Sequence, residues 1–331
     1  MQVIQSKENT MLQKLFVIVC LGLFLPNIVI AQSPPEGFVP PALNPDGVTL
    51  SVKPLGNNVY ALLSSKPPVD NAGFVVGNDG VLVIDAHINE KMAKQIIGAV
   101  RSVTDKPILY LVNTNGHADH TFGNYAFPAE TKIIAHKLTK VMMSPDMEKR
   151  KSGSLGMVAG DKKVFEAVQK RMPNLTFDKN MEIDLGGTTV ELHHFGAGNT
   201  AGDTVVYVPA AKAAWTGNLI LGEDSLPFLL IGDTVAYVNT LNNFAATLDV
   251  ETIVPGHGLP TTASIFNRYT RYLESLETAI RRAHDEDLSL EQTLKSYPLE
   301  NRFSVPDGLS SAEFYRGLHP FNIQKIYLEK K

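Results

Sequence analysis

Two histidines and an aspartate lie within four positions of each other in the segment Asn115-Gly116-His117-Ala118-Asp119-His120. A third histidine, His257, stands between two glycines in the segment Pro255-Gly256-His257-Gly258. Imidazole nitrogens and carboxylate oxygens are common ligands of Zn²⁺ and related dications, and this close spacing suits a loop that turns them toward one ion. The chain has one cysteine, so a metal site built from several thiolates is excluded. We therefore expect a site of histidine and carboxylate.

Both histidine segments follow short apolar runs that are typical of buried strands. Residues 107–113 precede the first segment, and residues 252–254 precede the second. Functional groups in proteins of mixed helices and strands are concentrated on loops at strand ends. We therefore expect the two loops to converge on one ion.

The remaining pattern predicts alternating strands and helices. Strands are expected at 58–63, 73–77, 81–85, 132–135, 205–208 and 213–216, and a hairpin at 181–195 turns at Gly186-Gly187. Helical spacing occurs around 92–100, 238–248, 265–283 and 322–329, and 137–151 is expected to be a solvated helix or loop. Because no change of composition marks a linker, we expect a single domain from 55 to 331 behind an extended leader at 32–54.

The first 31 residues have the pattern of a signal peptide. Lys14 precedes an apolar run from Leu15 to Leu25 that is too short to span a bilayer, and Ala31 lies at a small-residue cleavage pattern. Cleavage before Gln32 would leave an exported protein, periplasmic or secreted, without stable membrane insertion. It would also remove the chain's single cysteine, Cys20.

The composition is that of a soluble globular protein. The 331 residues are 44% hydrophobic and 19% charged, and 30 Lys and Arg against 34 Asp and Glu give a net charge of −4. There is no basic excess for neutralising phosphates, so we expect no nucleic-acid partner. A small-molecule substrate is the expectation that remains, and the sequence leaves the oligomeric state open.

In order and in residue type, these segments resemble the metallo-β-lactamase superfamily. The family's five motifs match, in sequence, Val83-Ile84-Asp85, the segment 115–120 as H-x-H-x-D-H, Gly198-Asn199-Thr200, Thr216-Gly217-Asn218, and the unchanged segment 255–258. The resemblance covers about residue 57 to the C-terminus. It implies an α+β sandwich with the αβ/βα four-layer fold, and a zinc-dependent hydrolase.

Three ligands that the resemblance implies are replaced by asparagine: Asn115, Asn199 and Asn218. In a two-zinc member, positions 115, 117 and 199 hold the first ion. Here that ion would keep only His117 beside two amide oxygens, which are weak zinc ligands. The position that bridges the two ions has become Asn218, which removes a negative charge that would offset their repulsion.

The ligands that the resemblance implies for the second ion survive as Asp119, His120 and His257. We therefore predict a monozinc site with an open fourth position, and the replacements argue against a second ion. We assign no residue to an organic cofactor. Asp85 matches the family's buried acid, which orients the metal loop without binding the metal.

Such a site would hydrolyse an ester, lactone, thioester or amide bond with metal-activated water. We predict His117 and Asp119 as catalytic residues, with His117, released from full ligation, as the general base. Asn218 is expected as a weak ligand or a hydrogen-bond partner. Asn115 or Asn199 is expected to donate a hydrogen bond to a developing oxyanion.

Two other functions stay open. A catalytically weakened or non-catalytic binding protein would result if the lost ligands leave the site empty, and metal content would separate this case from a hydrolase. In a non-heme iron, oxygen-using enzyme, Asp119, His120 and His257 would form the facial triad.

The other histidines are weighed as structural. His87 is expected to stabilise its loop, with a place beside the site as the alternative. Of His193 and His194, only one can face the site, because neighbouring residues of a strand point to opposite faces. His136 begins a predicted helix.

Overall fold

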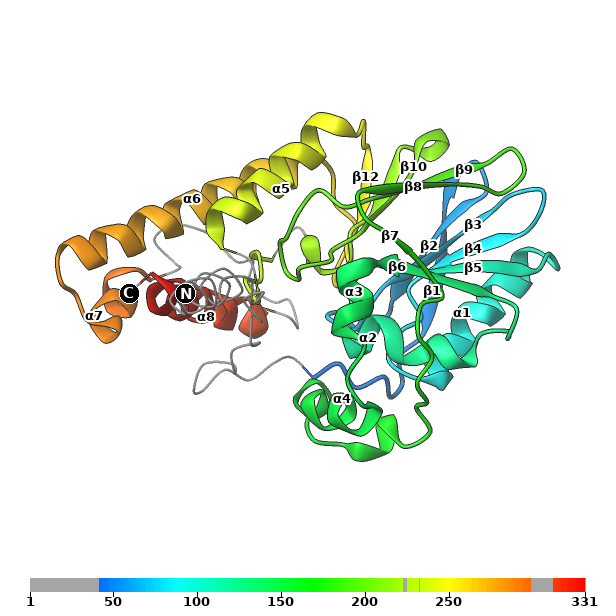
Figure 1. Ribbon diagram of the computed structural model, residues 1–331, viewed down its shortest axis with the longest axis horizontal. Coiled ribbons are helices and arrows are strands. Elements are labelled where there is room, and N and C mark those ends of the chain that lie inside the picture. Colours follow the sequence, from blue (N-terminus) through cyan, green and yellow to red (C-terminus); the bar gives the residue numbers. More distant parts are fainter. Residues whose placement is uncertain (1–41, 223–224, 232, 299–311, 331) are drawn as a thin grey trace, which may run out of the picture. The chain divides into compact units, whose positions relative to one another are not determined.

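The computed structural model describes residues 42–222, 225–231, 233–298 and 312–330. The predicted signal peptide and its cleavage site lie outside these residues. The described residues form two sheets, which are labelled strand by strand in Figure 1. One has seven strands in chain order, namely β1 (Leu50–Gly56), β2 (Val59–Ser64), β3 (Ala72–Val76), β4 (Val81–Ile84), β5 (Ile108–Asn113), β6 (Lys132–His136) and β7 (Leu175–Phe177). The other has five strands in the order β12-β11-β10-β9-β8, namely β8 (Asn180–Asp184), β9 (Thr189–His193), β10 (Val205–Val208), β11 (Ala213–Trp215) and β12 (Thr252–Val254).

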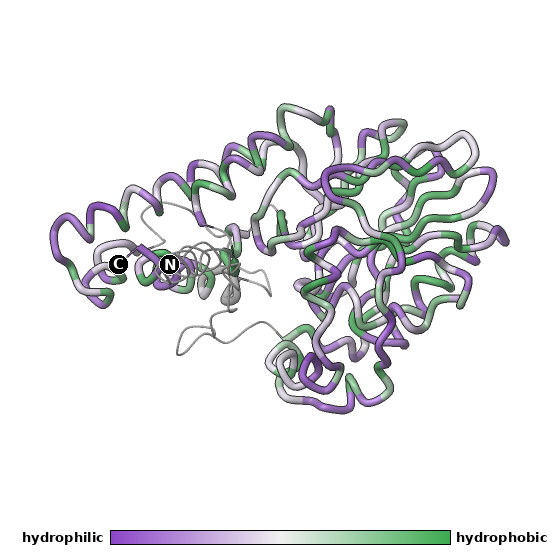
Figure 2. Tube along the Cα trace, in the orientation of Figure 1, coloured by the Kyte–Doolittle hydropathy of each residue, from purple (hydrophilic) through white to green (hydrophobic). Residues whose placement is uncertain are grey.

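The two sheets share an apolar core. Ile84 and Val112 of the first sheet pack in one cluster with Leu192, Val206 and Val254 of the second, and all five are fully buried. Each such side chain contributes roughly 1.5–3 kcal/mol by leaving water. Figure 2 shows the result as strands that are largely hydrophobic, because both faces of the central strands are covered.

Helices cover the outer face of each sheet. Helix α1 (Glu90–Val103) packs Ala93, Ile96 and Val100 against the first sheet. Helices α5 (Thr234–Thr247) and α6 (Ser264–Asp285) pack against the second sheet in another cluster, and α8 (Ala312–Glu329) packs on α6 and α7 (Leu290–Ser296) beyond the sheet (Figure 1). The order is therefore helix, sheet, sheet, helix, which confirms the predicted αβ/βα four-layer fold. The shorter helices are α2 (Ala118–Thr121), α3 (Lys137–Met142), α4 (Met147–Gly153) and α7 (Leu290–Ser296).

Parallel pairing brings the motif-bearing loops together. Strands β4, β5, β6 and β7 run parallel in the first sheet, and β11 and β12 run parallel in the second, so the loops after them leave from shared edges. The backbone N–H of Gly256 donates to the carbonyl of Gly217 at 2.8 Å, and that of Thr204 donates to Thr114 at 2.8 Å. The first bond joins the loops after β11 and β12, and the second joins the segment before β10 to the loop after β5 in the first sheet.

The predicted start of the domain at residue 55 is too late. Strand β1 begins at Leu50 and pairs with β2, and Leu43 and Val48 are buried. The sequence gives little sign of β1 because it is an edge strand with mostly exposed side chains, and it includes Pro54, which an edge tolerates. The last part of the predicted leader therefore belongs to the folded domain.

Three other elements differ from the sequence prediction. Strand β7 has three residues and helix α7 has seven, both too short to show a periodic apolar pattern. Helix α8 begins ten residues before the expected helix at 322–329. Of the helices in the described residues, none has the length and apolar character needed to cross a bilayer.

Candidate metal centre

Asp85, which directly follows β4, anchors the loop after β5. Its carboxylate accepts hydrogen bonds from the backbone N–H of Thr114 at 2.8 Å, from the Thr114 hydroxyl at 2.7 Å and from Nδ1 of His120 at 2.8 Å. The bond to Nδ1 fixes the imidazole and leaves its Nε2 pointing away from Asp85. A carboxylate that holds a histidine in this way is the usual partner of a metal-binding imidazole.

The backbone beside Asp85 is strained. Asp85 has φ +60° and His87 has φ +64°, a left-handed region that non-glycine residues rarely adopt. Such conformations are concentrated at functional sites, where the surrounding structure maintains them. Here they direct the Asp85 carboxylate to the loop after β5 and the His87 ring toward the β2–β3 loop.

His257 is held by the β2–β3 loop. Its Nδ1–H donates to the carbonyl of Pro68 at 2.6 Å, which leaves Nε2 with a free lone pair. Asn71 clamps the same two loops, because its N–H donates to Gly256 at 2.7 Å and its amide nitrogen donates to Gly258 at 2.7 Å. The ring of His257 is thus positioned by contacts on its far side.

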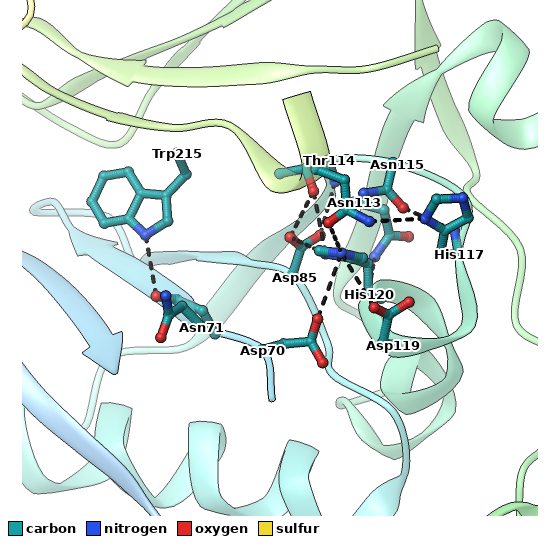
Figure 3. A network of polar contacts seen from close by, with 12 residues as sticks. Asp70, Asn71, Asp85, Asn113, Thr114, Asn115, His117, Asp119, His120 and Trp215 are labelled. Atoms are coloured by element: carbon teal, nitrogen blue, oxygen red, sulfur yellow. Dashed lines mark hydrogen bonds and ion pairs between the residues drawn. The ribbon is translucent and has the colours of Figure 1, made fainter. Parts of the chain in front are cut away.

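Four side chains gather between these loops: Asp70, Asp119, His120 and His257. We call them the carboxylate cluster. One ligand atom from each lies within 4.8 Å of the others, and all four residues are buried. His120 Nε2 lies 3.6 Å from Asp70 Oδ1 and 3.7 Å from Asp119 Oδ2, and His257 Nε2 lies 3.6 Å from Asp119 Oδ2. Figure 3 shows Asp70 and Asp119 directed toward His120.

The two carboxylates of this cluster lie beside each other and beside the imidazoles of His120 and His257. Neither oxygen of Asp70 or Asp119 has a hydrogen-bond partner among the described residues, although both residues are about 1% exposed. Burial and the charge of Asp119 raise the pKa of Asp70 well above its usual range. Burial acts in the same direction on Asp119, but the imidazoles of His120 and His257 outweigh it and lower its pKa. Buried carboxylates of this kind are typically paired with a charge or coordinate a metal.

The sequence prediction missed Asp70. It belongs to no recognised motif and stands alone between Pro68 and β3. A signal was nevertheless present, because β3 and β4 form an antiparallel hairpin in which Gly73 pairs with Ile84. That register places the start of β3 beside the end of β4, so an acidic residue just before β3 lies at the same sheet edge as Asp85.

Asn218 lies between the cluster and His117. Its amide oxygen is 2.8 Å from His120 Nε2, and its amide nitrogen donates to His117 Nδ1 at 3.0 Å. The amide is packed against Gly256, where a side chain would not fit, because a Cβ on Gly256 would lie 2.8 Å from the amide oxygen of Asn218. Asn218 therefore turns its acceptor toward the cluster and its donor toward His117.

His117 lies outside the carboxylate cluster, beside Asn115 (Figure 3). Because the Asn218 amide occupies the lone pair on Nδ1, the neutral ring carries its proton on Nε2. The general-base role of His117 requires a free lone pair and stays a prediction. Burial lowers the pKa of His117 to about 4, so the ring stays neutral at physiological pH and offers an N–H donor.

The other two asparagines offer one free polar atom each. Asn115 accepts from the backbone N–H of His117 at 2.9 Å, and its amide nitrogen has no partner among the described residues. Asn199 donates to the carbonyl of Phe228 at 2.9 Å, and its amide oxygen has no partner within that same part of the chain. Asn115 is thus available as a donor and Asn199 as an acceptor, and donation to an oxyanion by Asn115 or Asn199 stays a prediction.

The remaining histidines do not join the cluster. His87 donates from Nε2 to the carbonyl of Asp70 at 3.1 Å and accepts from the N–H of Ile88, so it holds the β2–β3 loop. His136 caps the N-terminus of α3 and stacks on His194, with ring centres 3.9 Å apart. His193 forms a hydrogen bond with Glu191.

Comparison with known proteins identifies the same family as the motifs. The model of the metallo-beta-lactamase superfamily matches residues 67–257. A metallo-beta-lactamase type 2 from Elizabethkingia meningoseptica is 25% identical over 193 residues, which cover 56% of this chain and 68% of that protein. A linear primary-alkylsulfatase from a Pseudomonas species is 21% identical over 286 residues, 75% of this chain, and this chain spans about half of that protein (53%). The solved metallo-beta-lactamase from Pontibacter korlensis has a TM-score of 0.53 at 18% identity and covers 68% of this chain and 99% of its own, a likeness of fold.

Proposed function

This chain belongs to the metallo-beta-lactamase superfamily, and on that premise we propose that it is a hydrolase that uses a single dication, Zn²⁺ in the first instance. The observation that carries the proposal is the carboxylate cluster, in which Asp119, His120 and His257 direct donor atoms to one point. The separations of 3.6–3.7 Å between their neighbouring donor atoms are close to the roughly 3.4 Å expected around a four-coordinate ion with bonds of about 2.1 Å. A dication bound there supplies Lewis-acid activation of water and polarisation of the scissile bond.

The proposal of one ion rests on the other side of the site. Asn115, His117 and Asn199 offer one imidazole and two amides. Amide oxygens are poor zinc ligands, and no carboxylate lies between the two halves of the site to offset the repulsion of two dications. We therefore propose that this side contacts substrate.

The free polar atoms define how a substrate would be held. The amide nitrogen of Asn115 and the Nε2–H of His117 are donors, and they can bond to a substrate oxygen whose negative charge grows as the bond is cleaved. The amide oxygen of Asn199 is an acceptor for a substrate N–H or O–H. This set favours an ester, lactone, thioester or amide, each of which carries a carbonyl oxygen.

Export remains part of the proposal. If residues 1–31 are removed, the mature protein begins near Gln32 and is periplasmic or secreted. N-terminal sequencing of the protein recovered from the expressing cells and their medium tests this, and an intact Met1 would contradict it.

The function is tested by metal analysis followed by a hydrolysis screen. Mature protein is purified without chelator, its zinc, iron and manganese contents are measured, and esters, lactones, thioesters and amides are assayed with and without added Zn²⁺. A β-lactam and a primary alkyl sulfate are included because two relatives carry those names. The control pair is Asp119→Asn, which should lose metal and turnover, and Asp203→Asn, which changes a buried carboxylate outside the cluster.

We expect about one equivalent of metal and hydrolysis of at least one bond class that Asp119→Asn abolishes. Metal retained without any hydrolysis would instead support a binding protein. Absence of metal in the wild type, even after Zn²⁺ is added, would overturn the proposed site.

A further inference from the structure

We propose that Asp70, in the loop between β2 and β3, is a fourth protein ligand of the ion, and that it supplies the negative charge absent at Asn218. The inference rests on the proposed metal site and deepens it. It assigns a residue that lies outside every motif on which the sequence prediction was based.

The backbone of Asp70 is fixed on both sides. His87 donates to its carbonyl at 3.1 Å, and the next residue, Asn71, bonds to Gly256 and Gly258 of the His257 loop. Asn71 also accepts from the backbone N–H of Ser64 at 3.0 Å, which ties the loop to the end of β2. The side chain of Asp70 is therefore held at the cluster by contacts that leave its own carboxylate free.

Two other buried aspartates, Asp85 and Asp203, have structural roles, and their carboxylates accept hydrogen bonds. Asp85 accepts three hydrogen bonds, from Thr114 and His120. Asp203 accepts two from Thr200, at 3.0 Å and 2.5 Å. Asp70 is as buried as these residues, yet in the described part of the chain both of its oxygens lack a hydrogen-bond partner.

Asp70 lies beside Asp119, the predicted ligand, and neither carboxylate accepts a hydrogen bond from an N–H or hydroxyl group of the described residues. Burying two unpaired carboxylates together is unfavourable unless a positive charge lies between them. The imidazoles lie close by, with Asp70 Oδ1 3.6 Å from His120 Nε2 and 3.4 Å from His257 Nδ1. These distances exceed those of a hydrogen bond, and a dication bound by the neutral imidazoles would supply the positive charge.

The position of Asp70 also explains how an asparagine is tolerated at 218. Two carboxylates balance one dication, and with Asp70 present both belong to the carboxylate cluster. Figure 3 shows Asp70 reaching His120 from the β2–β3 loop, with His117 and Asn115 on the other side of His120 in this view. The second negative charge therefore stays close to one ion and no longer lies where it could bridge two.

A fourth protein ligand changes the expected coordination. Four protein donors fill a tetrahedral zinc site, so a position for substrate requires a coordination number above four. Sets rich in carboxylate also suit Mn²⁺, and two histidines with a carboxylate suit Fe²⁺. We therefore expect Asp70 to broaden the range of metals that bind.

The test measures metal affinity and thermal stability, so it does not depend on a known substrate or on an enzymatic assay. Asp70→Asn, Asp70→Ala, Asp119→Asn and the matched control Asp203→Asn are prepared free of metal. The affinity for Zn²⁺ is measured by competition with a chelator, and Tm is measured with and without saturating Zn²⁺. Asp70→Ala is included because the amide that Asp70→Asn introduces could still act as a weak ligand.

We expect Asp70→Asn and Asp70→Ala to bind Zn²⁺ at least 10 to 100-fold more weakly than wild type. Asp70→Asn should reduce the Tm gain on Zn²⁺ addition, because it removes a charged ligand of the ion. The control Asp203→Asn should leave the Zn²⁺-dependent gain unchanged.

A purely structural Asp70 would give a different result. Both variants would then lower the metal-free Tm and keep the wild-type affinity and Tm gain, which would overturn the inference while the metal site stands. If wild type itself binds none of Zn²⁺, Mn²⁺ and Fe²⁺, the proposed function fails first and this inference fails with it.

Discussion

The two sides of the site differ in what their free atoms can hold. The carboxylate cluster has two buried carboxylates without hydrogen bonds and two imidazoles whose far nitrogens are anchored by Asp85 and Pro68. The other side has Asn115, His117 and Asn199, each already bonded at one polar atom and free at another. The first side has the charge to bind a dication, and the second has neutral donors and acceptors that bind a neutral or polarised group.

A few substitutions of carboxylate or imidazole by amide can separate metal binding from substrate binding. An amide keeps nearly the shape of a carboxylate but carries no charge, so it loses affinity for a dication and keeps the ability to form hydrogen bonds. Asn218 lies at the boundary, with its oxygen toward His120 and its nitrogen toward His117. Substitutions on either side of Asn218 should therefore affect metal binding and turnover separately.

Removing a ligand from the carboxylate cluster should have the largest effect. Asp119→Asn should weaken Zn²⁺ binding by more than about 100-fold, because loss of a direct ligand exceeds the roughly 10 to 100-fold effect of an outer partner. Chelator competition measures the affinity. Wild-type affinity in this variant would show that the ion, if bound, lies elsewhere.

Removing the free donor on the other side should reduce turnover and spare the metal. Asn115→Ala deletes the unpartnered amide nitrogen, and loss of one donor to a developing oxyanion costs on the order of 100-fold in kcat. The measurement pairs kcat on a hydrolysed substrate with metal content. A loss of metal in parallel with activity would mean that Asn115 acts as a ligand.

Asp85 should have an intermediate effect on affinity. Asp85→Asn keeps the shape but weakens the charge-assisted bond to His120 Nδ1, so Zn²⁺ affinity should fall by about 10 to 100-fold. Because Asp85 also holds Thr114, the Tm of the metal-free variant is measured alongside. Unchanged affinity would remove Asp85 from the account of how His120 is positioned.

Restoring the family's ligand types on the amide side should add an ion. The combined change Asn115→His, Asn199→His and Asn218→Asp gives that side two further imidazoles and a bridging carboxylate. Metal content should rise from about one to about two equivalents. A content that stays at one would show that geometry, and not ligand type, prevents the second ion from binding.

The smallest effect is expected away from the site, at His136. Burial of the ring and the neighbouring His194 lower the pKa of His136 from 6.5 to about 4. Above pH 6.5 the ring is neutral in the folded and unfolded states. Between pH 6.5 and 4 the unfolded state binds a proton that the folded state excludes, so stability falls as pH falls.

The variant His136→Asn can still cap α3 but does not titrate, so its Tm should fall less than that of wild type between pH 7 and pH 4.5. Equal slopes of Tm against pH for the two proteins would contradict the assigned cause.

Much of the fold and part of the site could be predicted from the sequence. Val83, Leu111 and Val206 lie in apolar runs that indicate buried strands, and the segments around Asp119 and His257 have spacing that indicates a metal site. Edge strand β1 has no such pattern, because its side chains face solvent. Its pairing with β2 depends on tertiary structure.

Asp70 and His117 show where local pattern is insufficient. Asp70 joins the cluster through the register of the β3–β4 hairpin, which places residues from distant motifs at one edge. His117 forms a hydrogen bond with Asn218, which is 101 residues away in the chain. Which lone pairs are free depends on three-dimensional contacts and cannot be inferred from spacing.

The most direct test of the central claim is an equilibrium titration of metal-free wild-type protein with Zn²⁺, with Asp119→Asn titrated in parallel. The account predicts one tight equivalent in the wild type and its loss in the variant. Two tight equivalents in the wild type, or one equivalent that binds equally well to Asp119→Asn, would contradict it.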